Sequence, residues 1–416
     1  MSALAPLRYP AFRSLAAGRT INALGNSFAV VALAFAVLDI TGSASDLGLV
    51  VGTRTLFMVI FMLFGGVLAD RLPKHLLMVG SNVVAAVSQG TSAVLVLTHT
   101  ATIPMLIGLA AVNGTAGALS MPASSAMLPG TVPEQIRQQA NALSRIMLNS
   151  AQIFGAPIAG VVVAAVGPGW GIAVDATSFA LAAGAFALVR VPEKTATGPA
   201  ERPHLFADLR TGWSEFRSRE WLWVVVVGFC VSNAAWSGGV AVLGPVIANR
   251  SFGSQGWGLV LGAQTAGMIV GGLIAMRLRL RRMLYFGVAC CFPYALPLLA
   301  LGTFPRVYVL APCAFVAGLM IEQFGVAWET TMQEHVPADK LARVYSYDML
   351  GSLLAMPIGE VAVGPISKLA GVETTVFGAG VLIALAVIGM LSSRDVRTLP
   401  HKRSEPVAEP MGESVA

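Results

Sequence analysis

The stretch from Gly65 to His75 reads Gly-Gly-Val-Leu-Ala-Asp-Arg-Leu-Pro-Lys-His, so a long apolar run ends abruptly in charged residues. A similar run, Gly-Gly-Leu-Ile-Ala-Met-Arg, begins 206 positions later and occupies residues 271–277. A match at about half the length of the chain indicates an internal repeat. The pattern around residues 65–75 therefore predicts two related halves, each with apolar segments that end in charged connections.

Other matches lie at nearly the same offset and support this repeat. Val132-Pro133 corresponds to Val336-Pro337, and three glycines of the first half recur in the second. The glycine pairs are Gly155 and Gly359, Gly160 and Gly364, and Gly167 and Gly371. Two matching halves predict two helical bundles that enclose a cavity and tilt against each other, so that the cavity opens to one side at a time.

The composition excludes most classes of soluble protein. Hydrophobic residues make up 56% of the 416 residues and charged residues only 12%, whereas a soluble domain carries about a quarter charged residues. So little polar surface excludes a soluble enzyme, a disordered chain and a nucleic-acid binder, in spite of the net charge of +6. The long continuous apolar runs predict an all-α integral membrane protein rather than a membrane barrel.

Twelve apolar segments are long enough to cross a bilayer, which takes about 20 residues in a helix. We expect membrane spans at 13–38, 47–69, 76–97, 103–123, 140–166, 170–189, 221–247, 256–277, 283–302, 306–328, 344–367 and 373–392. The spans divide into two groups of six, so we expect bundles at 1–190 and 221–395. Residues 191–220 predict a cytoplasmic linker with an amphipathic helix, and residues 396–416 predict a disordered tail.

Lysine and arginine are distributed unevenly between the two sides of the predicted membrane. Most of the 27 basic residues fall into the terminal segments and the connections after even-numbered spans, whereas Arg250, Arg306 and Lys368 fall at the opposite face. Cytoplasmic loops carry the excess of basic residues. We therefore expect both termini in the cytoplasm and the chain in the inner (plasma) membrane. This topology explains the basic composition without an anionic partner.

The loop after the second span, Gly66-Val67-Leu68-Ala69-Asp70-Arg71-Leu72-Pro73-Lys74-His75, resembles the signature of the major facilitator superfamily of secondary transporters. The chain is similar throughout to the bacterial exporter branch of macrolide-efflux and enterobactin-exporter-like proteins. Segments that carry this similarity include Phe12-Arg13, Asp175-Ala176-Thr177-Ser178-Phe179 and Pro357-Ile358-Gly359. The resemblance implies the major facilitator fold, with twelve transmembrane helices in two pseudo-symmetric six-helix bundles.

Charged side chains inside the predicted spans need a partner or water, because each costs about 2.5–3.5 kcal/mol to insert at the centre of a bilayer. The candidates are Arg19, Arg54, Arg145, Asp175, Glu322, Glu329, Asp348 and Glu360. Glu322 stands in an apolar run about 18 Å from the inner face. Because desolvation favours the protonated form of a carboxyl group, we interpret Glu322 as a proton-coupling or cation-binding carboxylate. The alternative is a structural glutamate that is hydrogen-bonded to a neighbouring helix.

Arg54 and Glu360 stand on the second and eleventh spans, both about 25 Å from the inner face. These spans face each other in the superfamily fold, so the resemblance predicts an Arg54–Glu360 contact that holds the outer side closed. Separate pairing within each half is the alternative. On the first span, Arg19, Asn22 and Asn26 share one helical face. We expect this face to line the substrate cavity or to bind neighbouring helices.

A second charged layer is predicted about 8 Å from the inner surface. Arg145, Glu329 and Asp348 lie at this depth, together with Asp70 and Arg71 of the signature loop. In superfamily members the aspartate of this loop contacts the start of span 11 when the inner side is closed. The resemblance therefore implies a cytoplasmic gate in this layer, whereas snorkelling and packing of the charged side chains are the alternative.

These patterns predict a secondary transporter that exports a small amphipathic organic compound, a drug or natural product, by proton antiport. The chain has no Gly-Lys-Ser/Thr nucleotide-binding loop, so ATP is not the predicted energy source. The expected partners are a small-molecule substrate, protons and the lipid bilayer, without nucleic acid, metal or cofactor, and we expect a monomer. A siderophore or metabolite transporter and a transport-inactive membrane scaffold are the alternatives. An enzyme is not predicted, because the spans contain no nucleophile–base pair.

Overall fold

The computed structural model of the chain describes residues 4–71, 73–189, 213–214, 216–275, 277–278 and 280–400. The side chains at 63–71, 121, 122, 126, 338, 339, 342, 343 and 346 also lie outside the described part. Every regular element within these ranges is a helix. Twelve helical segments are long and apolar enough to cross a membrane, which confirms the predicted all-α fold with twelve spans.

Six long helices form the first bundle. They are α1 (Pro10–Thr41), α2 (Ala44–Arg71), α3 (Lys74–Leu97), α4 (Ile103–Met127), α5 (Arg137–Val166) and α6 (Pro168–Ala187). Short 3-10 segments precede α1 and join α4 to α5; they are η1 (Ala5–Arg8), η2 (Leu128–Thr131) and η3 (Glu134–Ile136). The turn from α1 to α2 is short because Gly42 adopts φ of 64° and ends α1, a conformation that favours glycine.

The second bundle also has six spans, but three of them are built from shorter helices. The uninterrupted spans are α10 (Gly253–Ala275), α13 (Val307–His335) and α16 (Val372–Ser392). The seventh span combines α8 (Glu220–Trp236), the π-helix η4 (Ser237–Leu243) and α9 (Gly244–Ser251). The ninth combines α11 (Met283–Ala289), η5 (Phe292–Ala295) and α12 (Leu296–Thr303), and the eleventh combines α14 (Ala338–Leu353) and α15 (Met356–Ala370). The short helix α17 (Arg394–Thr398) follows α16.

Proline stands beside each of these interruptions. Pro245, Pro293 and Pro357 follow the starts of α9, η5 and α15 by one residue. Proline removes a helical hydrogen bond and its ring clashes with the preceding turn, so a new helical segment begins there. The sequence predicts the three spans but not their division, because proline is tolerated within membrane helices when neighbours satisfy the freed backbone groups.

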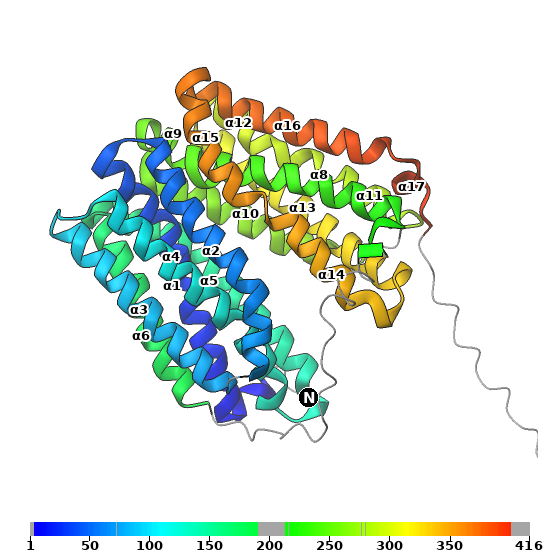
Figure 1. Cartoon of the computed structure of the whole chain (residues 1–416), viewed down its shortest axis with the longest axis horizontal. Coiled ribbons are helices and arrows are strands. Elements are labelled where there is room, and N and C mark those ends of the chain that lie inside the picture. The colour runs from blue at the N-terminus through cyan, green and yellow to red at the C-terminus, as the bar shows by residue number, and fades with distance from the viewer. Residues whose placement is uncertain are drawn as a thin grey trace, which may run out of the picture.

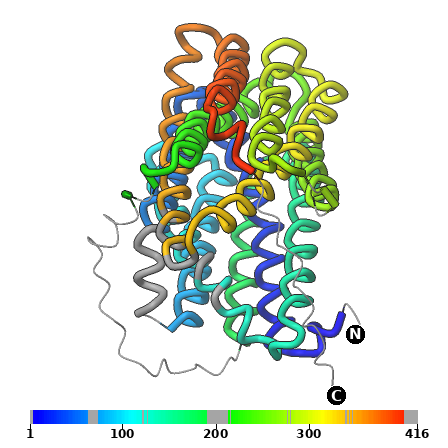
Figure 2. Tube along the Cα trace, turned by 90° about the vertical axis from the view of Figure 1, so that its right-hand side faces the viewer, coloured from blue at the N-terminus to red at the C-terminus, as the bar shows by residue number. Residues whose placement is uncertain are grey.

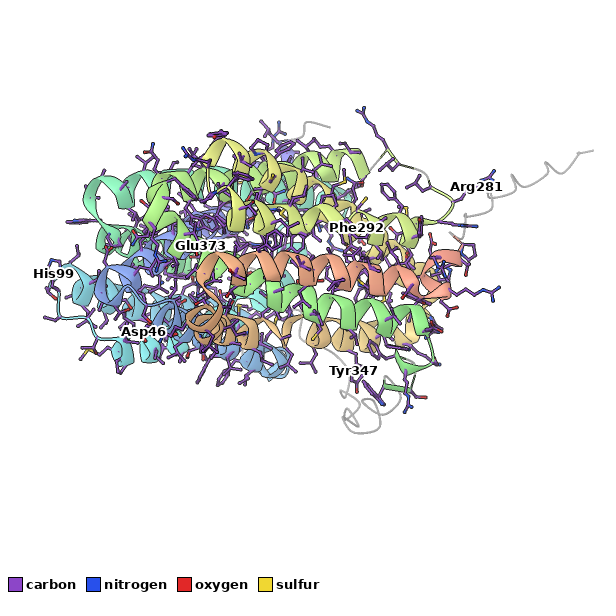
Figure 3. The ribbon with its side chains drawn as sticks, turned by 90° about the horizontal axis from the view of Figure 1, so that it is seen from above. Asp46, His99, Arg281, Phe292, Tyr347 and Glu373 are labelled. Atoms are coloured by element: carbon purple, nitrogen blue, oxygen red, sulfur yellow. The ribbon has the colours of Figure 1, made fainter. Side chains whose placement is uncertain are left out.

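The two bundles lie side by side at one end of the molecule and diverge toward the other (Figure 1), and a view from the right-hand side of Figure 1 shows most of the second bundle above the first (Figure 2). Asp46, His99 and Glu373 lie toward the first end, and Arg281 lies at the second (Figure 3). We call the first end the closed end and the second the divergent end. The start of α1 and the short helix α17 both lie at the divergent end (Figure 1).

The buried apolar residues divide in the same way. One cluster runs through both bundles and includes Phe28 on α1, Ile247 on α9 and Leu298 on α12. A second cluster belongs to the first bundle alone and includes Phe12 and Phe186. The bundles therefore share a core at the closed end, whereas the first bundle has a core of its own at the divergent end.

The predicted linker lies mostly outside the described residues, and so does the chain beyond residue 400. Near the end of the linker, the rings of Trp213 and Phe216 stack with their centroids 5.7 Å apart. Both rings also contact Tyr347 of α14, at 5.7 and 5.9 Å between centroids. The last residues before α8 are therefore anchored on the eleventh span.

Candidate functional site

Two helix crossings join the bundles at the closed end, and glycines allow a close approach in both. At the first crossing α2 packs on α15, where a Cβ atom on Gly48 would overlap the backbone of α15. At the second crossing α5 packs on α10, where a Cβ on Gly258 would overlap the backbone of α5. Ser254 Oγ donates a 3.1 Å hydrogen bond to the carbonyl of Gly160 across this crossing. Small residues let membrane helices pack closely, so these crossings hold the closed end together.

Arg54 of α2 lies between carboxylates from both bundles. Its guanidinium donates a 2.6 Å hydrogen bond to Asn26 Oδ1 on α1. It also interacts electrostatically with Asp175 on α6 and with Glu360 on α15. The sequence predicted an Arg54–Glu360 contact. The structure places the two charges close enough to interact electrostatically across the bundles, but they form no direct ion pair among the described residues, and the hydrogen bond of Arg54 goes to Asn26. One arginine therefore faces a carboxylate of each bundle.

Glu360 is only 2% exposed and is bound from both sides of the first crossing. Ser237 of η4 donates a hydrogen bond to Glu360 Oε1, and the Thr55 side chain on α2 hydrogen-bonds the same carboxylate. Glu360 Oε2 has no hydrogen-bond partner among the described residues. Ser237 is the first residue of the π-helical turn, a local widening of a helix that occurs often at functional sites.

Asp175 is fully buried inside the first bundle. Gln89 Nε2 on α3 donates a 2.6 Å hydrogen bond to Asp175 Oδ2, and Oδ1 has no hydrogen-bond partner among the described residues. A Cβ on Gly25 of α1 would lie 2.9 Å from Oδ1, so α1 also packs closely on this carboxylate. Asp175 was named in the sequence as an intramembrane charge but received no partner. It is the only ionisable residue of α6, which is the signal that marks it.

The predicted polar face of α1 makes different contacts along its length. Asn22 Nδ2 donates a 2.7 Å hydrogen bond to Asn82 Oδ1 on α3, and Asn82 Nδ2 donates a 2.9 Å bond to Ser120 Oγ on α4. Asn26 is exposed and accepts the hydrogen bond of the α2 arginine. Arg19 is half-buried and makes no hydrogen bond to the described residues. Asn22 therefore connects three helices, whereas Arg19 and Asn26 stay accessible to solvent.

A second pair of opposite charges joins the bundles farther from the closed end. Glu322 of α13 is half-buried, and its side chain packs on Gly271 and Gly272 of α10. Its carboxylate interacts electrostatically with Arg145 of α5, which is exposed. The sequence placed Arg145 in the inner charged layer and left Glu322 without a charged partner. The structure brings these two residues of opposite bundles together.

Two other predicted members of the inner layer, Asp348 and Glu329, make hydrogen bonds within the second bundle. Trp328 Nε1 of α13 donates a 3.1 Å hydrogen bond to Asp348 Oδ2 of α14. Glu329 is exposed, and its hydrogen bond comes from Gln333 one turn along the same helix. The side chains of Asp70 and Arg71 lie outside the described residues, so the contact of Asp70 with span 11 stays a prediction.

Stacked aromatic side chains join helices within the second bundle. The rings of Phe229 and Phe324 stack at 4.1 Å between centroids, and those of Trp236 and Tyr294 at 3.9 Å. These stacks fix α8 against α13 and η5. In the first bundle, Phe57 lines an apolar cavity of about 410 Å³ between α2, α3 and α4.

The sequence matches the Major Facilitator Superfamily over residues 15–360. The chain belongs to this superfamily. It is therefore a multi-pass membrane protein of the transporter class and not an enzyme, as the sequence predicted.

Two relatives align with almost the whole chain. Macrolide efflux protein A of Streptococcus pyogenes is 21% identical over 401 residues, which cover 94% of this chain and 98% of the relative. Multidrug efflux pump Tap of Mycolicibacterium fortuitum is 25% identical over 411 residues, which cover 94% of this chain and 96% of the relative.

Solved structures of transporters share the fold. The nucleoside transporter NupG superimposes with a TM-score of 0.73 at 13% identity, over 92% of this chain and 100% of the other. A bacterial homologue of the lysosomal transporter Spinster superimposes with a TM-score of 0.72 at 13% identity, over 93% and 97%. This similarity confirms the major facilitator fold with its two six-helix bundles.

Proposed function

We propose that this transporter exports small amphipathic organic compounds, drugs or natural products, in exchange for protons and by alternating access. The observation that carries the proposal is the unequal packing of the two ends. The bundles share a buried core at the closed end and diverge at the other. Alternating access requires a substrate site between two bundles with one end closed at a time, and this arrangement fits that requirement.

We place the divergent end and both termini in the cytoplasm of a cell whose inner (plasma) membrane holds the protein. The excess of lysine and arginine in the connections at that end supports this orientation. In this proposal, residues 1–190 and 221–395 are the two units that tilt, residues 191–220 connect them, residues 396–416 are a cytoplasmic tail, and the transporter works as a monomer. Asp70, Arg71, Glu329 and Asp348 would then close the cytoplasmic end when the bundles tilt back.

Export and an amphipathic substrate are supported by two kinds of observation. The relatives that align with the whole chain are named for macrolide efflux and for multidrug efflux. In the second bundle, stacked rings such as Phe229 and Phe324 stand on the same helices as polar groups. Apolar contact area combined with a few polar groups is what sites for small organic ligands commonly offer.

We propose that Glu322 binds the substrate and the exchanged proton, one at a time. Its carboxyl group is half-buried and faces Arg145 of the other bundle. A carboxyl group that binds either a proton or a cationic substrate, but not both together, makes the two fluxes run in opposite directions. Because Arg145 is exposed, its charge is screened by solvent, which leaves Glu322 available to a cation.

The test uses the full chain in proteoliposomes with an imposed pH gradient. Transport of a cationic dye, a macrolide and a siderophore would be compared, and we expect uphill movement of the first two. Glu322→Gln should lower uphill transport of the cationic dye by at least about tenfold, which corresponds to about 1.4 kcal/mol. Glu373→Gln, an exposed glutamate at the closed end, is the matched control. Unchanged pH-driven transport in Glu322→Gln would contradict the assignment.

A further inference from the structure

The charges around Arg54 do not balance. Arg54 brings one positive charge, whereas Asp175 and Glu360 together bring two negative charges when both are ionised. Asp175 is 0% exposed and Glu360 is 2% exposed, so water does not solvate the remaining charge. An uncompensated charge that is buried in protein is strongly unfavourable. The cluster as packed here therefore needs one more positive charge.

The surroundings of the cluster do not supply this charge. The neighbours that hydrogen-bond the two carboxylates are neutral: Gln89 on α3 for Asp175, and Ser237 and Thr55 for Glu360. The other ionisable residues on the helices packed around the cluster are Arg13, Arg19, Asp39, Asp46, Asp70, Arg71, Lys74, His75, Arg137, Arg145, Glu220, Cys230, Lys368 and Glu373. Within the described part of the chain, Arg54 is the one charged group that interacts with either carboxylate.

We propose that Asp175, Arg54 and Glu360 form a proton site that is divided between the bundles and is complete only when the closed end is shut. One proton then sits on either carboxylate and balances the cluster. The proposal rests on the alternating access proposed above, and it assigns a coupling role to Asp175, which acts together with a residue of the opposite bundle.

The division between the bundles connects the proton to the tilting motion. Asp175 and Arg54 both belong to the first bundle and stay together when the bundles tilt, whereas Glu360 moves with the second. When the closed end opens, Arg54 and Asp175 form a neutral pair, and Glu360 enters water and ionises. When this end shuts again, Glu360 returns to a neutral pair and must take up one proton from the outer solution. Shutting the closed end therefore consumes one external proton.

The proton can leave toward the cytoplasm once the divergent end is open. Asn26 is exposed and Arg54 is half-buried, so one edge of the cluster contacts solvent while both carboxylates stay buried. Release of the proton restores the unbalanced charge and favours reopening of the closed end. The cluster thus moves one proton inward for each complete tilt of the bundles, in addition to the proton that Glu322 exchanges, and the carboxyl O–H bond is the one covalent bond that forms and breaks.

The charge count gives an expectation for each variant. Asp175→Asn leaves Arg54 with Glu360 alone, and Glu360→Gln leaves it with Asp175 alone, so shutting the closed end needs no proton in either variant. Arg54→Gln leaves Asp175 without a positive partner; because Asp175 is buried inside the first bundle, it stays protonated whether the closed end is open or shut, and shutting still needs one proton for Glu360. The ratio of shut to open molecules should therefore change about tenfold per pH unit in the unmodified protein and in Arg54→Gln, and not at all in Asp175→Asn and Glu360→Gln.

The experiment measures the distance between spin labels at the closed end as the pH is varied, without any substrate. Labels on Thr102→Cys and Glu373→Cys would report separation of the bundles in the full chain after Cys230, Cys290, Cys291 and Cys313 are replaced by alanine. We expect low pH to favour the shorter distance in sodium and in choline buffers alike. Asp39→Asn, a carboxylate of α1 outside the cluster, should keep the tenfold dependence.

Several results would overturn the proposal. One is a tenfold dependence that persists in Asp175→Asn or Glu360→Gln, and another is a dependence on sodium instead of pH. A third is loss of the dependence in Glu322→Gln, because the proton that governs shutting would then be the one on Glu322 and not one on the cluster. The two single variants lie in different bundles, so one remains informative if the other does not fold. Since no substrate is present, failure of drug export leaves this measurement unaffected.

Discussion

The two helix crossings of the closed end are built alike, but the charged residues near them differ in burial. At each crossing a helix of the first bundle packs on one of the second through glycine contacts. Near each crossing, an arginine of the first bundle interacts with a glutamate of the second. At α2 and α15, Arg54 meets a glutamate that is almost completely buried. At α5 and α10, Arg145 is exposed and meets Glu322, which is half-buried on the adjacent α13.

The difference in burial decides what each pair can do. Exposed ion pairs contribute about 0–1 kcal/mol, because solvent screens them and both side chains remain mobile. Removing one partner of a buried pair costs about 3–5 kcal/mol, because a charge is left without compensation. The buried pair therefore makes closure depend on its charge state, whereas the exposed pair can exchange its partner for a ligand.

The largest effect is expected when a substitution forces the two helices of a crossing apart. Gly258→Val would place a branched side chain in the backbone of α5, so the closed end could not shut. We expect transport in proteoliposomes to fall to background, and the label distance at the closed end to lengthen at every pH. Gly108→Val is the matched control, because no atom lies within 4 Å of a Cβ at Gly108. A fully active Gly258→Val variant would contradict the assignment of this crossing as a closing surface.

An intermediate effect should separate Arg54, which is half-buried, from Arg145, which is exposed. Arg54→Gln leaves two buried carboxylates without a positive partner, so we expect the stability at neutral pH to fall by about 3–5 kcal/mol. Arg145→Gln removes an exposed partner and should cost no more than about 1 kcal/mol. Thermal unfolding of both variants in the same detergent measures the difference. Equal losses of stability would show that burial does not distinguish the two pairs.

The smallest effect concerns the affinity of the exposed pair for a cation. Arg145 competes with a cationic substrate for Glu322, so Arg145→Gln should tighten binding of a cationic dye by up to about fivefold, corresponding to about 1 kcal/mol. The gain should shrink at high salt, because exposed charges are screened within about 10 Å at 0.1 M. Equilibrium binding at low and high salt measures both expectations, with a neutral dye as the control. Weaker cation binding in Arg145→Gln would mean that Arg145 positions Glu322 instead of competing for it.

The fold follows from the sequence because its signals are long and repeated. Twenty-residue apolar segments, the distribution of basic residues and the motif around Asp70 all agree on twelve spans. The interruptions in the seventh, ninth and eleventh spans could not be predicted, because a proline such as Pro157 lies inside an unbroken α5, whereas Pro357 accompanies a break. Whether the neighbouring helices satisfy the freed backbone groups is a property of packing that sequence does not display.

The sequence predicts how deep each charged residue of the site lies in the membrane, but not which neighbouring helix its side chain faces. Counting residues along helices placed Arg54 and Glu360 at the same level, and the structure brings them together. The same counting placed Arg145 with Glu329 and Asp348, although it meets Glu322. Depth fixes one coordinate, whereas the rotation of each helix about its axis decides which neighbour a side chain faces. Asp175 was left without a partner for this reason, since Arg54 reaches it from another helix.

The break in the eleventh span has a mechanical consequence. Asn233 of α8 donates a 2.9 Å hydrogen bond to the carbonyl of Ser352, at the end of α14 just before the break. A carbonyl that the break would leave without its helical partner is thus already satisfied from a neighbouring helix. The joint between α14 and α15 can therefore bend while the Ser352 carbonyl keeps a hydrogen-bond partner. Bending at this joint would move α14, at the divergent end, relative to α15, which packs on α2 at the closed end.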